Sequence, residues 1–116
     1  MAKKLPRIPD AQLEVLEALW QVGKGTVREV LTQLQWTGRE WSYATVSTLL
    51  QRLEQKGLVA SDRSGFAHVY RAAVSRPAVV ERRLQHLIDK VYHGEPGLLV
   101  VHLLKSHKLT REHKHE

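Results

Sequence analysis

The stretch WSYATVSTLLQRLEQKG, residues 41–57, is predicted to form a helix with one apolar face and one face of small polar side chains. Val46, Leu50 and Leu53 share the apolar face, because successive residues of a helix are about 100° apart. The opposite face holds Ala44, Thr48, Gln51 and Gln55, with Ser47 and Arg52 on its flanks. Short side chains allow a helix backbone to come close to base edges, where Ser and Thr bond donors or acceptors and methyl groups contact thymine. This face therefore favours entry into the major groove of DNA.

Further polar and basic residues around this helix are candidates for contacts with sugar and phosphate, which position a protein on DNA without specifying sequence. Near the helix start these are Tyr43 and Thr45, and Arg63 is expected at the tip of a following hairpin. The full set of predicted DNA-binding residues is Ser42, Tyr43, Ala44, Thr45, Ser47, Thr48, Gln51, Arg52, Arg63 and His68. All of these residue types also occur on ordinary protein surfaces, so the interpretation depends on the elements that hold them in place.

Two helices are predicted before this one. The first spans residues 10–22, with Asp10 as N-cap and Gly23 as the stop. The second begins at Thr26, which forms a capping-box pattern with Glu29. The third begins at Ser42 as N-cap and ends at Gly57.

A hairpin is predicted immediately after the third helix, in LVASDRSGFAHVYRA. Its two arms are rich in Val, Phe and Tyr and are expected to meet in a two-residue turn at Ser64-Gly65. Three helices followed by a hairpin are the order of a winged helix-turn-helix domain. Trp36 and Trp41 flank the loop before the third helix and are expected to plug the edge of the core.

The C-terminal part of the chain is predicted to be helical and to need a partner. One helix should begin near Ser75, with Pro77 in its first turn, and run to Gly94. The following segment, Leu98–Leu104, is apolar all round except at His102, and one striped helix is too little to bury it. A second subunit is the simplest cover, through the apolar residues Leu84, Leu87, Ile88, Val91, Leu98, Leu99, Val101, Leu103 and Leu104.

The predicted fold class is therefore mainly α with a small β-hairpin. A winged helix domain spans residues 1–74, and a C-terminal helical dimerisation region with a polar tail spans residues 75–116. The tail is expected to fray.

Composition limits the functional classes. Lys and Arg outnumber Asp and Glu by 18 to 12, and the resulting charge of +6 suits a polyanionic partner such as double-stranded DNA. The chain has no cysteine, which removes disulfides and thiolate metal sites. The start of the chain lacks the apolar segment of a signal peptide, and no run is long enough to span a membrane. We expect a soluble cytoplasmic protein without membrane insertion.

The sequence leaves three alternatives to DNA binding. An enzyme is disfavoured because GKG at 23–25 lacks the other P-loop residues and no catalytic triad pattern is present, so neither catalysis nor a cofactor is expected. A winged helix used only for protein-protein contacts would need no small polar face. The third alternative is a metal-responsive regulator, which is suggested by His107, His113 and His115. A Lys-rich chain end lacks the surrounding hydrogen-bond partners that orient the ligands of a regulatory metal site, so no metal is predicted.

Several blocks of the chain resemble the BlaI/MecI penicillinase repressor family: DAQLEVLEALWQVGKGTVREV, WSYATVSTLLQRLEQKGLV, RSGFAHVYRAAVSR and GEPGLLVVHLL. The similarity covers roughly residues 7–110. It implies a homodimeric winged-helix repressor that binds an inverted-repeat operator. It also implies release when a membrane-bound sensor protease triggers cleavage of the repressor.

The resemblance also assigns positions. The DNA-contacting helix of the family falls on Ser42–Arg52 and its wing on Arg63–His68. Members often carry Lys or Arg at the positions of Ala44 and Ser47, so the operator sequence does not follow from the resemblance. The bond that is cleaved in the family aligns with His102-Leu103. Copper-responsive relatives carry a cysteine cluster, which this chain does not have.

Overall fold

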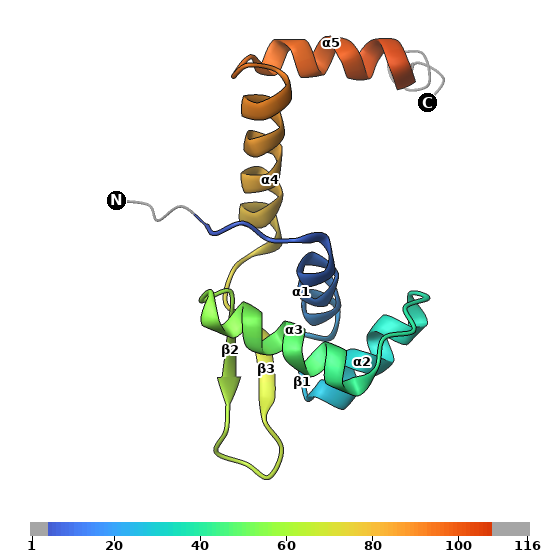
Figure 1. Ribbon diagram of the computed structural model, residues 1–116, viewed down its shortest axis with the longest axis vertical. Helices are drawn as coiled ribbons and strands as arrows, with labels where there is room; N and C mark the ends of the chain where they lie inside the picture. The colour runs from blue at the N-terminus through green and yellow to red at the C-terminus, as the bar shows by residue number, and fades with distance from the viewer. Residues whose placement is uncertain (1–4, 108–116) are drawn as a thin grey trace. The chain divides into compact units, whose positions relative to one another are not determined.

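The computed structural model describes residues 5–107, which form a mainly helical fold with a small antiparallel sheet. The described residues fall into two compact units that divide between Ala78 and Val79. In Figure 1 the first unit contains α1 (Asp10–Val22), β1 (Lys24–Gly25), α2 (Val27–Trp36), α3 (Tyr43–Gln55), β2 (Val59–Asp62) and β3 (Val69–Ala72). Helix α4 (Arg76–Val91) begins just before the division, and α5 (Pro96–His107) follows it. The predicted fold class is confirmed.

The helices of the first unit begin where side chains can accept the unpaired backbone N–H groups of a first turn. Thr26 Oγ1 accepts a hydrogen bond from Glu29 N at 3.2 Å, and Glu29 Oε1 accepts one from Thr26 N at 2.8 Å, which is the predicted capping box. Ser42 Oγ accepts from Thr45 N at 3.1 Å, so the predicted start of α3 is also confirmed. The N-cap prediction for α1 is wrong by one residue, because Asp10 is already helical and Pro9 occupies the cap position.

The core lies between α1, α2, α3 and the sheet. Its fully buried side chains include Leu16, Leu19, Val30, Leu34, Val46, Leu50, Leu53 and Leu58. Each buried Leu or Val contributes roughly 1.5–3 kcal/mol relative to exposure. The buried amide of Gln12 accepts a hydrogen bond from Lys56 Nζ at 2.7 Å, which joins α1 to the end of α3. This core holds α3 with its apolar row inward and leaves the opposite side in solvent.

The sheet has three strands in the order β1-β3-β2, and both pairings are antiparallel. The sequence interpretation predicted only the hairpin, and β1 is a two-residue strand in which Lys24 pairs with Arg71 and Gly25 with Tyr70. We call β2, β3 and the loop 63–68 between them the wing, which projects away from the helices in Figure 1.

The predicted two-residue turn at Ser64-Gly65 is wrong. Strand pairing ends at Asp62 and Val69, so the connecting loop has the residues 63–68. Asp62 Oδ1 accepts hydrogen bonds from Ser64 N at 2.9 Å and from Ser64 Oγ at 2.6 Å. This local turn changes the direction of the backbone directly after β2, so the two strands are not joined by a two-residue turn. Gly65 is not among the glycines with positive φ.

The two tryptophans expected at the core edge behave differently from that prediction. The exposed fraction of Trp36 is 82%, so its predicted role in the core is wrong. Trp41 is half-buried, and the guanidinium carbon of Arg39 lies 4.7 Å from its ring centroid. Arg39 also forms an ion pair with Glu14 of α1. The loop before α3 is therefore fixed by a stacked cation, with Trp36 outside the core.

In the second unit, α4 and α5 leave most of their apolar side chains in solvent. Of the residues predicted for dimerisation, Ile88 is buried and Leu99 half-buried, while Leu84, Leu87, Val91, Leu98, Val101, Leu103 and Leu104 are exposed. The expectation that α5 must be buried is therefore not met within one chain. His102 Nδ1 lies 2.6 Å from Tyr92 Oη, which ties α5 to the end of α4. Among residues 5–107, no helix has the length and apolar character needed to cross a membrane.

Candidate nucleic-acid interface

Helix α3 presents the predicted row of short polar side chains to solvent. Ala44, Thr48, Gln51 and Gln55 are exposed, whereas the apolar row with Val46 on it is buried. Ser47 is half-buried on the flank, and its Oγ accepts a hydrogen bond from Gln51 Nε2 at 3.3 Å. This bond runs along the helix surface and steadies the Gln51 amide. The exposed face thus carries hydroxyl, amide and methyl groups without an acidic side chain at its centre, which suits contacts with base edges.

The start of α3 gathers several predicted contact residues. Ser42 and Thr45 are exposed, and their hydroxyl oxygens lie 3.1 Å apart. Tyr43 is 49% exposed, and the guanidinium carbon of Arg28 lies 5.4 Å from its ring centroid. Sequence reasoning missed Arg28, which belongs to α2. The sequence feature that could have indicated Arg28 is its position in the first turn of a helix, where cations are disfavoured.

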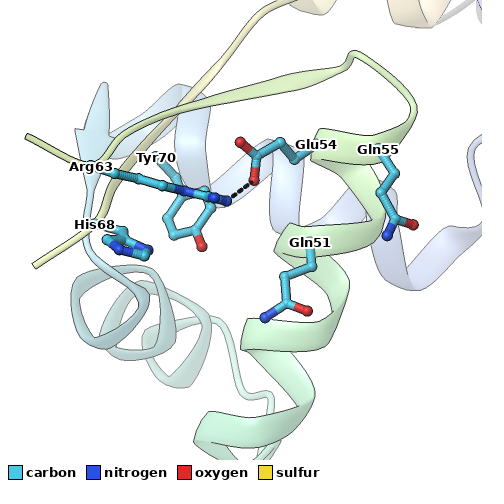
Figure 2. A pocket seen from close by; sticks show the side chains of 6 residues that line it. All are labelled: Gln51, Glu54, Gln55, Arg63, His68 and Tyr70. Carbon is cyan, nitrogen blue, oxygen red and sulfur yellow. Dashed lines mark hydrogen bonds and ion pairs between the residues drawn. The ribbon is translucent and has the colours of Figure 1, made fainter.

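The wing is connected to α3 by an ion pair. Figure 2 shows the Arg63 side chain reaching from the wing to Glu54 on α3, with Arg63 Nη2 2.9 Å from Glu54 Oε1. Arg63 Nε also donates to Ser61 Oγ at 3.1 Å, and Ser61 Oγ donates to Glu54 Oε2 at 2.5 Å. Arg63 was predicted to bind phosphate, and the pairing with Glu54 was not foreseen. The contact joins the wing to the end of α3.

An open hollow of about 580 Å³ lies between α3 and the wing. Its lining residues are Gln51, Glu54, Gln55, Arg63, His68 and Tyr70. Tyr70 closes the hollow from the buried side, since it is almost fully buried, and His68 stands exposed on the wing. The hollow is therefore lined by hydrogen-bonding side chains from both elements.

The wing loop and the end of α3 also show shifted pKa values. The pKa of the Asp62 carboxyl is lowered because the Ser64 hydroxyl, and then the Ser64 N–H, donate hydrogen bonds to it. The pKa of the Lys56 ammonium is lowered first by burial and then by the charges of Arg52 and Arg7. Arg52 itself is exposed near the C-terminal end of α3. Because its pKa is lowered, the Asp62 carboxyl is ionised at neutral pH, and in this form it accepts both hydrogen bonds from Ser64.

No cluster of three or more metal-ligating side chains is present in the part of the chain that the structure describes. Of the histidines that raised a metal-responsive alternative, His113 and His115 lie outside the described residues, and His107 is the last residue of α5.

Comparison with protein families gives a match between residues 8–116 and the family model described as penicillinase repressor. The chain is 30% identical over 114 residues to a penicillinase repressor of Bacillus licheniformis, and this region covers 98% of the chain and 88% of that protein. It is 38% identical over 78 residues to the transcriptional regulator BlaI of Mycobacterium tuberculosis (strain CDC 1551 / Oshkosh), covering 66% of the chain and 56% of that protein.

Two solved structures resemble the same part of the chain. One is the solution structure of the DNA-binding domain of the repressor BlaI, with a TM-score of 0.56 and 34% identity. The other is the monomeric form of Bacillus licheniformis BlaI in complex with the blaP half-operator, with a TM-score of 0.55 and 32% identity. Each match covers 66% of this chain and 93% of the compared chain.

Proposed function

Because this chain belongs to the penicillinase repressor family, we propose that it represses transcription by binding an inverted-repeat DNA operator as a homodimer, with α3 in the major groove. The observation that carries the proposal is the exposed face of α3, where Ala44, Thr48 and Gln51 offer methyl, hydroxyl and amide groups to base edges. The similar repressor solved with a half-operator supports the same mode of binding. We place this activity in the cytoplasm, with the DNA that it acts on.

Electrostatics contributes the part of binding that does not depend on sequence. The chain has a formal charge of +6, and the exposed Arg52 lies on the flank of the outward face of α3. Neutralised phosphates release counterions, so affinity falls as salt rises. Arg63 contributes in a second way, because it neutralises Glu54, whose carboxylate would otherwise face the DNA phosphates.

Dimerisation is proposed to use the exposed apolar residues of α4 and α5. Five of the six apolar side chains in Leu98–Leu104 are at least 39% exposed. Exposed apolar area of this extent is typical of an interface rather than of a monomer surface. A symmetric dimer would bury it and place two copies of α3 at a fixed separation, so that both half-sites are bound together.

Release from DNA is proposed to follow cleavage of His102-Leu103 by a sensor protease. This bond lies inside α5, and the ring of His102 contacts Tyr92, the residue that follows α4. Cleavage would separate Leu103 and Leu104 from the first half of α5 and thereby remove part of the dimer surface. Mass spectrometry of the cleavage products after induction checks the position, and products cut at another bond would contradict it.

Selection of binding sites from random double-stranded DNA tests the central proposal. The expected result is a palindromic sequence with two half-sites spaced by about one helical turn or a multiple of it. The affinity for the selected site should exceed that for a scrambled duplex and fall steeply with salt. A chain that enriches no sequence and shows no salt-dependent binding to any duplex is not a DNA-binding repressor.

A further inference from the structure

Arg28 and Tyr43 form a pair between two helices at the start of α3. Arg28 is the second residue of α2 and Tyr43 the first residue of α3. The guanidinium carbon of Arg28 lies 5.4 Å from the centroid of the Tyr43 ring. A cation over an aromatic face at this distance is attracted by the ring, and the ring restricts the directions in which the guanidinium can point. Both side chains are exposed, so the pair stays accessible from solvent.

The position of Arg28 works against the stability of α2. The N-terminal end of a helix carries a partial positive charge, and a cation in its first turn is disfavoured. Glu29, the next residue, places a carboxylate in the same turn, where it accepts the hydrogen bond from Thr26 N that closes the capping box, and among residues 5–107 no ion pair joins it to Arg28. A residue that breaks a local preference is expected at functional or strained sites.

Three other arginines of the first unit are paired with carboxylates, whereas no ion pair joins Arg7, Arg52 or Arg71 to a carboxylate among residues 5–107. Arg39 pairs with Glu14, Arg63 with Glu54 and Arg76 with Glu17. No ion pair joins Arg28 to a carboxylate among residues 5–107. Its partner is the neutral ring of Tyr43, which orients the guanidinium without cancelling its charge. The arrangement therefore keeps an uncompensated positive charge, held in a restricted orientation, beside the exposed face of α3.

We propose that Arg28 binds a phosphate of the DNA backbone and that Tyr43 is the positioning residue that holds it there. This inference rests on the proposed DNA binding by α3. The planar guanidinium offers donors that match two phosphate oxygens at once, which a lysine ammonium does not. With Arg28 bound to phosphate on the α2 side and the wing on the other side, α3 is held from two directions, which sets its depth and register in the groove.

The test compares Arg28→Ala, Arg28→Lys, Tyr43→Ala and Tyr43→Phe in the full-length chain. Binding is measured at several salt concentrations on two duplexes, the selected operator and a scrambled sequence. Arg28→Ala should weaken binding to both duplexes by a similar factor and reduce the salt slope by about 0.9 for each protomer bound. Arg28→Lys should keep most of the slope but lose part of the affinity. Tyr43→Phe, which keeps the ring, should bind more tightly than Tyr43→Ala, and Tyr43→Ala should weaken binding while retaining the slope.

Arg76→Ala is the matched control, because it removes the same charge from an arginine that is paired with Glu17 of α1. It should leave the slope unchanged. Unfolding curves establish that each variant is folded at the temperature of the binding assay. If Arg28→Ala lowers only the melting temperature and leaves affinity and slope as in the wild type, the pair is structural and the inference is wrong. Wild-type protein that binds no duplex would instead contradict the proposed function, so the two failures are distinguishable.

Discussion

Arg63 of the wing and Glu54 of α3 form an ion pair in which Arg63 Nη2 lies 2.9 Å from Glu54 Oε1. Their side chains retain 56% and 28% of their exposure. An ion pair with this much solvent contact contributes little to folding, typically less than about 1 kcal/mol. We expect a larger consequence for DNA binding, because the guanidinium that is predicted to bind phosphate is also paired with Glu54, which among residues 5–107 is the one carboxylate that lines the hollow between α3 and the wing.

Removal of the carboxylate should therefore strengthen DNA binding. Glu54→Gln keeps the shape of the side chain, releases Arg63 and removes a negative charge that repels phosphate. We expect tighter binding to the operator and to unrelated duplexes alike. Arg63→Ala should weaken both, by more than the loss of a single phosphate contact, because Glu54 is then unmasked.

The double variant separates the two effects. If masking of Glu54 is important, Glu54→Gln combined with Arg63→Ala should bind better than Arg63→Ala alone. The measurement is a double-mutant cycle of affinities at low salt, with thermal unfolding as the control for folding. Equal affinities of Arg63→Ala and the double variant would show that Glu54 does not face the DNA.

Direct contact between α3 and bases is tested at Thr48, which is exposed at the centre of the outward face. Thr48→Glu should abolish specific binding, because the carboxylate repels phosphate and a base contact is lost. The free energy of unfolding should change by no more than about 0.5 kcal/mol, because the site is exposed. A Thr48→Glu variant that binds the selected operator as tightly as the wild type would exclude α3 from the groove.

The capping box at the start of α2 gives a prediction for stability alone. Thr26→Ala removes the acceptor for Glu29 N and should lower the free energy of unfolding by about 1 kcal/mol. Chemical denaturation followed by circular dichroism measures the change. Thr37→Ala is a suitable control, because its hydroxyl donates to a carbonyl at the end of α2 and satisfies no N–H group of the first turn. A loss as large for Thr37→Ala would indicate a general effect of hydroxyl removal.

Features encoded by adjacent residues were predictable from the sequence. The starts of α2 and α3 follow from Thr26, Glu29 and Ser42, since the side chain that caps each helix lies within three residues of its backbone partner. The exposed row of α3 follows from helical periodicity in the same way. These predictions needed no knowledge of which segments meet in the fold.

Features that depend on distant segments were not predictable. Strand β1 exists only because Lys24 and Gly25 lie beside β3, and its two residues have no strand preference of their own. Trp36 is expected in the core by residue type. However, the buried face of α2 includes Leu34, and Trp36 lies on the exposed side of the helix. The contacts of Arg28 with Tyr43 and of Arg63 with Glu54 likewise join residues whose proximity depends on tertiary packing.

Dependence of DNA affinity on a dimer is tested at Leu98 and Val101, which are 50% and 48% exposed and lie one helical turn apart on α5. Aspartate at both positions should prevent association, because charges would have to be buried in an apolar interface. The winged helix unit should still fold, since neither residue belongs to it. Analytical ultracentrifugation should then show a monomer. The full operator should be bound hardly better than a half-site, because a second protomer is no longer held at a high effective concentration near the second half-site. His86→Asp, at an exposed position on the face of α4 opposite to Leu84, Leu87 and Val91, should leave the dimer intact. Wild-type protein that sediments as a monomer at micromolar concentration while it binds the palindrome tightly would refute this dependence.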